Sequence, residues 1–239
     1  MAINVSLFYP GIYDFIKGIE LAQYATTLAG TCLDGLRRFC MDTGIWQKTL
    51  SAITVTSPTA AYSLSLPTDS DDGKADLVHV EWAKFRLTAD ADTQYVTLIP
   101  RSRQYMDQYF GPAWEYQTGR PTMFVVDEPQ TILLYPIPDS SSAGKLLVRP
   151  ALMPTLDATK TIDFLYNKYQ HTIQFAILNE IYGLTNKPWS DQELATAALE
   201  DYTRELYIAK NFVQSGLNKT INSPFFPATG GSRNADGNW

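Results

Sequence analysis

The sequence has little of what catalysis and metal binding most often use. It contains only two cysteines and two histidines in 239 residues. Neither His79 nor His171 has a partner at the His-x-x-x-His or Cys-x-x-Cys spacing of metal sites. The Gly-x-Ser-x-Gly, P-loop and dinucleotide-binding glycine motifs are absent as well. We therefore expect no catalytic residue, no cofactor and no metal site.

Long apolar runs and clusters of basic residues are also scarce. No stretch approaches 18 consecutive apolar residues, and residues 1–4 lack the basic region and apolar run of a signal peptide. We expect a product made in the cytoplasm that does not bind membranes. The 19 Lys and Arg residues are scattered among 25 Asp and Glu residues, for a net charge of −6. Contact with nucleic acid is therefore expected to be weak or repulsive.

The pattern of apolar residues predicts helices near both ends of the chain. A short amphipathic segment covers residues 8–16, interrupted at Pro10-Gly11. Steps of three and four from Leu21 to Cys40 predict a long amphipathic helix that ends at Gly44. In this helix Cys32 and Cys40 lie about 12 Å apart, too far for a disulfide, so we expect buried free thiols.

Two glycines lie within this long predicted helix. Gly30 and Gly35 each cost about 1 kcal/mol relative to Ala in a helix interior. They are explained either by close packing against a neighbouring helix or by a bend in the helix.

Between residues 49 and 153 short apolar runs are separated by Pro and Gly. We predict strands at 62–66, 77–85, 95–99, 123–126, 131–135 and 146–153, and a short helix at 102–110. In the run 77–85 the alternation places Val78, Val80 and Trp82 on one face and His79 and Glu81 on the other. This pattern favours a small antiparallel β-sandwich or barrel.

Helical periodicity returns near Asp163, and Ser190 and Glu193 are predicted to form a capping box for the last helix. The predicted fold class is therefore α+β. A helical bundle formed from the N- and C-terminal segments carries an inserted small antiparallel β-sandwich or barrel domain. The expected boundaries are a helical part at 1–48, the β-rich domain at 49–153, a helical hairpin at 154–215 and an extended C-terminal arm at 216–239.

The C-terminal arm is rich in Asn, Gly, Ser and Pro, and it has too few apolar residues to bury much of itself. One interpretation is a docking segment that becomes ordered on a partner, and the other is a frayed terminus with incidental aromatics. The docking interpretation rests on the bulky and rigid residues of the arm, which are Leu217, Ile221, Pro224, Phe225, Phe226, Pro227 and Trp239.

Three stretches between residues 20 and 212 together resemble the head-to-tail adaptor proteins of tailed bacteriophages. The first is the helix end from Leu36-Arg37-Arg38-Phe39-Cys40 to Thr43-Gly44-Ile45-Trp46. The second is Gly119-Arg120-Pro121 followed by Leu134-Tyr135-Pro136-Ile137-Pro138. The third is a helix over 166–184 followed by Lys187-Pro188-Trp189-Ser190-Asp191 and Glu193-Leu194-Ala195.

The resemblance implies a structural virion protein of the neck, made in the host cytoplasm, and not an enzyme. Such adaptors form a twelve-membered ring beneath the portal, link it to a tail, nozzle or tail-completion protein, and surround the DNA channel used in genome ejection. The partners are then the portal, the tail protein, further copies of this chain and double-stranded DNA as passing cargo. The arm is expected to dock on the portal, and the candidates for contacts within the ring are Trp46, Tyr135, Trp189 and Tyr202.

Charge supports the same expectation. Twelve chains of net charge −6 carry a large negative charge, and a negatively lined channel repels phosphates and lets DNA slide.

Two alternatives stay open at this point. Any two of the 25 acidic residues are enough for a peptidoglycan hydrolase. Trp82, Trp114 and Tyr116 form the stacking platform of a carbohydrate-binding module if they are exposed together, whereas core or contact residues are buried.

Overall fold

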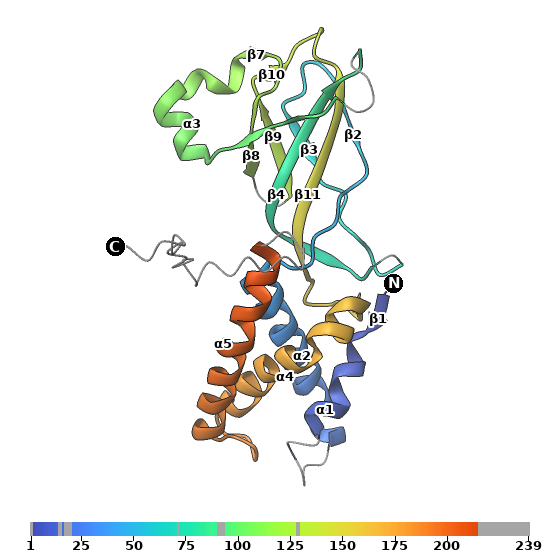
Figure 1. The fold of residues 1–239 in the computed structure, drawn as a ribbon, viewed down its shortest axis with the longest axis vertical. Coiled ribbons are helices and arrows are strands. Elements are labelled where there is room, and N and C mark those ends of the chain that lie inside the picture. The colour runs from blue at the N-terminus through green and yellow to red at the C-terminus, as the bar shows by residue number, and fades with distance from the viewer. Residues whose placement is uncertain are drawn as a thin grey trace, which may run out of the picture.

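The structure is a computed structural model that describes residues 2–13, 16, 21–70, 72–89, 94–127 and 130–214. The long helices gather in one half of an elongated molecule and most strands in the other (Figure 1). The expected mixed α+β class is confirmed. Among the described residues, no sheet closes into a barrel.

The helical half contains the first and last segments of the described chain. Its central helix α2 (Leu21–Thr43) packs against α4 (Asp163–Gly183) and α5 (Gln192–Gln214). The turn between α4 and α5 lies at the end of the molecule away from the sheets, and α5 runs back toward them (Figure 1). The core between these helices is apolar and includes Leu36, Phe39, Ile177 and Tyr202.

The end of α2 is as the sequence predicts. Gly44 has a φ of +58°, a left-handed conformation that Gly adopts without a Cβ penalty, and its N–H donates to the Cys40 carbonyl over 2.8 Å. Gly35 lies where α2 packs closely against α4, because a Cβ on it would lie 2.5 Å from Ile177 Cγ1. A Cβ on Gly30 would meet nothing within 4 Å.

The start of the chain differs from the expected amphipathic segment. Strand β1 (Ala2–Asn4) pairs with β12 (Lys160–Ile162), and a 3-10 turn η1 (Val5–Phe8) leads into α1 (Tyr9–Tyr13). The predicted break at Pro10-Gly11 is wrong, because both residues lie inside α1. Pro10 is in the first turn, where a helix leaves its N–H groups without intrahelical partners.

The predicted capping box is also wrong, because α5 begins one residue later than expected. Asp191 caps it instead, and its Oδ1 accepts hydrogen bonds of 3.0 Å from the N–H groups of Glu193 and Leu194. Ser190 serves the turn between the helices: its hydroxyl accepts from the Lys187 N–H and donates to the Leu184 carbonyl.

Most strands of the other half form two four-stranded sheets. One has the order β2-β11-β4-β5 and the other β3-β9-β8-β6. The pairs β6–β8 and β7–β10 are parallel, so the expectation of a wholly antiparallel β region is wrong at these two short pairs. The strands are β2 (Ile53–Val55), β3 (Ala61–Ser63), β4 (Ala75–Leu87), β5 (Val96–Thr97), β6 (Ile99–Pro100), β7 (Thr118–Gly119), β8 (Met123–Asp127), β9 (Thr131–Tyr135), β10 (Ile137–Pro138) and β11 (Gly144–Pro154).

The two sheets share a buried core, in which Phe85 and Leu146 of the first meet Phe124 and Leu134 of the second. The other face of the second sheet is covered by α3 (Arg103–Phe110) and the 3-10 helix η2 (Pro112–Tyr116) through Met106 and Trp114, among others. The helix α3 is predicted by the sequence and is capped by Ser102, which accepts from the Tyr105 N–H. The layers therefore run from an open face on the first sheet to α3 and η2 on the far side.

The predicted alternation along β4 is wrong in part. Its pairing with β11 passes over Val78 and Glu81, which are extra residues at two irregularities of the register. Each extra residue moves the following side chains to the other face. Val80 therefore packs against the core together with Ala83 and Phe85, and Trp82 lies on the outer face beneath Lys84.

The long strands β4 and β11 connect the two halves. Their ends reach the helical half, where Ala75 and Leu152 join the core of the helices. From α2, the Arg37 guanidinium contacts Asp76 Oδ2 of β4 at 3.1 Å and donates to the Pro154 carbonyl of β11. The helical half and the sheets are thus held by shared packing and by charge.

Candidate interaction surfaces

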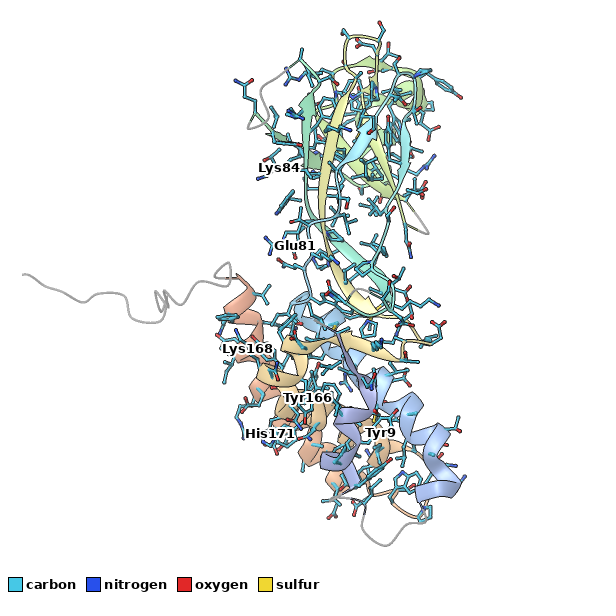
Figure 2. All side chains as sticks on the ribbon, turned by 90° about the vertical axis from the view of Figure 1, so that its right-hand side faces the viewer. Tyr9, Glu81, Lys84, Tyr166, Lys168 and His171 are labelled. Atoms are coloured by element: carbon cyan, nitrogen blue, oxygen red, sulfur yellow. The ribbon has the colours of Figure 1, made fainter. Side chains whose placement is uncertain are left out.

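Side chains that commonly act in catalysis or metal binding do not gather at one place in the described part of the chain. No group of three or more His, Cys, Asp or Glu residues that could hold a metal occurs among the described residues. His79 and Glu81 lie on β4 with Nε2 and Oε1 2.8 Å apart, and His171 packs against Phe175 on α4 (Figure 2). Within the described ranges, no helix has the length and apolar character needed to cross a bilayer.

Both cysteines are buried and free in the helical core. Burial raises the pKa of the Cys32 and Cys40 thiols to about 12. A thiol with such a pKa stays protonated near neutral pH and is a poor nucleophile or metal ligand.

One hollow of about 270 Å³ lies between the second sheet and the α3 layer. Arg103 lines it and pairs with Glu115 and, at 3.1 Å, with Asp127. The two carboxylates are thus bound to one guanidinium. This arrangement fastens α3 and η2 to β8.

The aromatic residues considered for sugar stacking do not form an open platform. Trp114 is only 2% exposed, and its indole N–H donates to Asp107 Oδ1 over 2.7 Å. Tyr116 is 80% exposed. Trp82 lies on the other side of the sheets, where the Lys84 Nζ is 4.7 Å from its ring centroid.

A polar network joins the three long helices. The Arg38 guanidinium of α2 contacts Asn179 Oδ1 at 2.8 Å and Glu180 Oε1 at 2.9 Å on α4, and lies over the Tyr202 ring of α5. The Tyr202 hydroxyl donates to Asp42 Oδ2 over 2.8 Å. Burial, and then this hydrogen bond, raise the pKa of Tyr202, so the phenol remains a neutral donor.

The four aromatic candidates for ring contacts all pack inside the single chain. Trp46, Trp189 and Tyr202 lie in the core of the helical half, and Tyr135 lies in the core beneath α3. Their exposures are 0%, 6%, 1% and 5%, respectively, so the folded chain does not present them to a neighbour. The arm candidates Leu217, Ile221, Pro224, Phe225, Phe226, Pro227 and Trp239 lie outside the described residues.

The exposed apolar side chains of α5, which we call the α5 surface, lie among exposed charged residues such as Glu200 and Arg204. Leu194, Leu199, Tyr207 and Ile208 are 47%, 37%, 58% and 61% exposed. By helical geometry, Leu194 and Ile208 lie on one flank of the buried face and Leu199 on the other. The signal in the sequence is that α5 has more apolar positions than one buried stripe needs.

Comparison with known families gives a match over most of the chain. A family model described as SU10 adaptor protein matches residues 20–220. The matched range includes α2, both large sheets and the α4–α5 hairpin. No curated protein matches the chain.

Proposed function

Because this chain belongs to the SU10 adaptor protein family of phage head-to-tail adaptors, we propose that it forms a ring beneath the portal, joins the portal to the tail and continues the DNA channel. Membership of the family makes the chain a structural component of a phage virion. The proposal adds the place in the neck, twelve copies, the portal above, and a tail, nozzle or tail-completion protein below.

The observation that carries the ring proposal is the apolar surface of α5. Each subunit of a closed ring meets a neighbour on either side and uses a different surface for each. Leu194 and Ile208 on one flank and Leu199 on the other provide apolar contacts in both directions. Full burial of an exposed side chain contributes about 1.5–3 kcal/mol, and these three contribute less than that each, because they are already partly buried in the single chain.

Each proposed domain has its own role in the proposed ring. Residues 1–48 and 154–215 make a helical bundle that forms the rigid wall of the ring, and the β-sandwich of residues 49–153 faces the tail and adjacent subunits. Trp46, Tyr135, Trp189 and Tyr202 support these surfaces from beneath, since each is buried in the single chain.

We assign portal docking to the arm of residues 216–239, on the sequence of its anchors Phe225, Phe226 and Trp239. Ordering a chain segment costs on the order of 1–2 kcal/mol per residue, and burial of a large side chain returns about 1.5–3 kcal/mol. The arm therefore needs a partner to become ordered. This favours assembly on a preformed portal over a stable free ring.

The ring surface is tested with matched substitutions on and off α5. Ile208→Glu and Leu199→Glu introduce a charge on either flank, and we expect each to prevent assembly on portal rings in a sedimentation assay. Leu156→Glu is the control, because Leu156 is 69% exposed on a turn outside α5. Assembly of the α5 variants at the level of the control would show that α5 is not a ring contact.

The arm is tested by a separate truncation. Removal of residues 217–239 is expected to abolish docking on the portal while the circular dichroism spectrum and unfolding midpoint of the remaining chain stay unchanged. Docking of the truncated chain would refute the assignment of the arm.

A further inference from the structure

The open face of the sheet β2-β11-β4-β5 gathers cationic side chains from its two long strands. The register places Lys145 of β11 opposite Arg86 of β4, and Leu147 opposite Lys84. Arg149 lies opposite Trp82, two pairs further along and therefore on the same face. These residues alternate with side chains that fill the core between the sheets, namely Ala83, Phe85, Leu146 and Val148. We call Lys84, Arg86, Lys145 and Arg149 the cationic face.

Aromatic and hydroxyl side chains support these cations on the sheet. Lys84 Nζ lies 4.7 Å from the Trp82 ring centroid, and Arg86 Cζ lies 5.4 Å from that of Tyr95. Lys145 Nζ donates to Thr54 Oγ1 over 2.8 Å. Lys84 is at the surface of the sheet, well away from the helices (Figure 2). A cation–π contact of this kind holds the Lys84 ammonium in place without neutralising it.

The cationic face differs from the basic residues that connect elements of the helical half and its junction with the sheets. In the helical half and at its junction with the sheets, Arg37, Arg38 and Lys48 each pair with a carboxylate. Within the ranges that the structure describes, no carboxylate lies within ion-pair distance of Lys84, Lys145 or Arg149. Like charges on paired strands repel one another. An anionic partner would relieve this repulsion.

The chemistry of the face favours a nucleic acid backbone over a protein. Two of the four cations are lysines, which are depleted in protein–protein interfaces although arginine and aromatic residues are enriched there, and the core of such an interface is apolar. The exposed large hydrophobic side chains of the described chain include Val96 and Ile99 but neither Trp82, Tyr95 nor Leu147 of this face. A row of cations over two strands, without an exposed apolar centre, suits a linear polyanion.

We propose that the cationic face binds the phosphate backbone of double-stranded DNA. The inference rests on the proposed function in that DNA is the cargo of the ring. With about three phosphate contacts, from Lys84, Lys145 and Arg149, binding is independent of sequence, weak, and dependent on salt, with a slope of log K against log [salt] of about −2.7. Weak contacts of this type allow the duplex to slide. The net charge of −6 therefore does not describe this face.

The test is fluorescence anisotropy of a labelled DNA duplex titrated with the full-length chain at increasing KCl. We expect measurable affinity at low salt and a slope between about −2 and −3. The charge reversal Lys84→Glu with Lys145→Glu is expected to weaken binding at least tenfold. The matched control, Lys168→Glu with Lys210→Glu, makes the same change in net charge on the helical half and is expected to stay within twofold of the wild type.

Two further variants keep the outcome interpretable. Lys84→Arg with Lys145→Arg retains the charges and is expected to retain binding. Lys84→Gln with Lys145→Gln removes them without adding repulsion, and unfolding midpoints check the fold of each variant. No salt-dependent binding, or equal loss in the helical control, overturns the proposal. So does unaltered DNA binding in the charge-reversal variant. Because the assay uses no portal, it is independent of the ring test.

Discussion

Gly35 and Gly30 lie five residues apart in α2 and differ in what surrounds them. A Cβ on Gly35 would lie 2.5 Å from Ile177 Cγ1 and 3.0 Å from the Ile177 backbone nitrogen, whereas Gly30 has open space. We predict that Gly35→Ala lowers the free energy of unfolding by about 1–3 kcal/mol, because α2 and α4 must move apart. Gly30→Ala is predicted to raise it by up to about 1 kcal/mol through helix propensity.

Urea unfolding of the two variants measures both effects. Opposite signs confirm that Gly35 marks the contact between the helices and Gly30 does not. Stabilisation by both substitutions would mean that α2 and α4 are not packed as closely as described.

The two buried thiols predict a loss of stability at alkaline pH. Burial raises the pKa of Cys32 and Cys40 from 9.0 to about 12. In the unfolded chain they ionise near pH 9, so their contribution is complete below that pH and decreases as the pH rises from about 9 to about 12. Buried tyrosines such as Tyr202, whose pKa is also raised, add to the decrease at higher pH.

The contribution of the thiols is measured by comparing the wild type with the Cys32→Ala, Cys40→Ala double variant. Between pH 8 and pH 10.5, the free energy of unfolding is expected to fall more steeply in the wild type. Parallel slopes would contradict the burial of the thiols.

At the scale of elements, the start of α5 depends on one carboxylate. Asp191 accepts from the N–H groups of Glu193 and Leu194. Asp191→Ala is therefore predicted to cost about 0.5–2 kcal/mol of unfolding free energy, and Glu193→Ala less than half of that. Thermal or urea unfolding of the two variants checks this order. A larger loss of unfolding free energy for Glu193→Ala than for Asp191→Ala would instead support the capping box expected from the sequence.

Elements with a local signal could be predicted from the sequence, and those fixed by tertiary contacts could not. Gly44 ends α2 and Ser102 begins α3, because both effects act within a few residues. The faces of β4 could not be predicted, since its alternation is reset where the pairing with β11 passes over Val78 and Glu81. Pro10 was expected to break a helix but lies in the first turn of α1.

At the scale of the whole molecule, function depends on surfaces assembled from distant parts of the chain. Lys84 and Lys145 are far apart in the sequence, and only the register of β4 and β11 brings them to one face. In the sequence the basic residues are scattered, so the sequence alone does not show that these two lysines share a face. Similarly, the high aromatic content suggests interface residues, yet Trp46 and Tyr202 are buried in the core of the single chain. The exposed apolar residues instead include Tyr207 and Ile208 of α5.

The two halves offer separate surfaces on one connected body. The α5 surface offers apolar contacts to a second copy in the proposed ring, whereas the cationic face of the sheet is proposed to contact a polyanion. The shared strands β4 and β11 hold the two surfaces in a fixed relation, because their ends pack in the helical core through Ala75 and Leu152. In the proposed ring, the apolar contacts would lie in the helical part and the cationic faces at the level of the sheets.

The central claim is tested most directly by mass photometry of portal rings from the same genome, alone and after mixing with this chain. The adaptor account predicts a portal peak heavier by twelve times the chain mass of 26.8 kDa, and no such shift with the chain that lacks residues 217–239. A portal peak of unchanged mass at saturating chain concentration would contradict a ring docked on the portal.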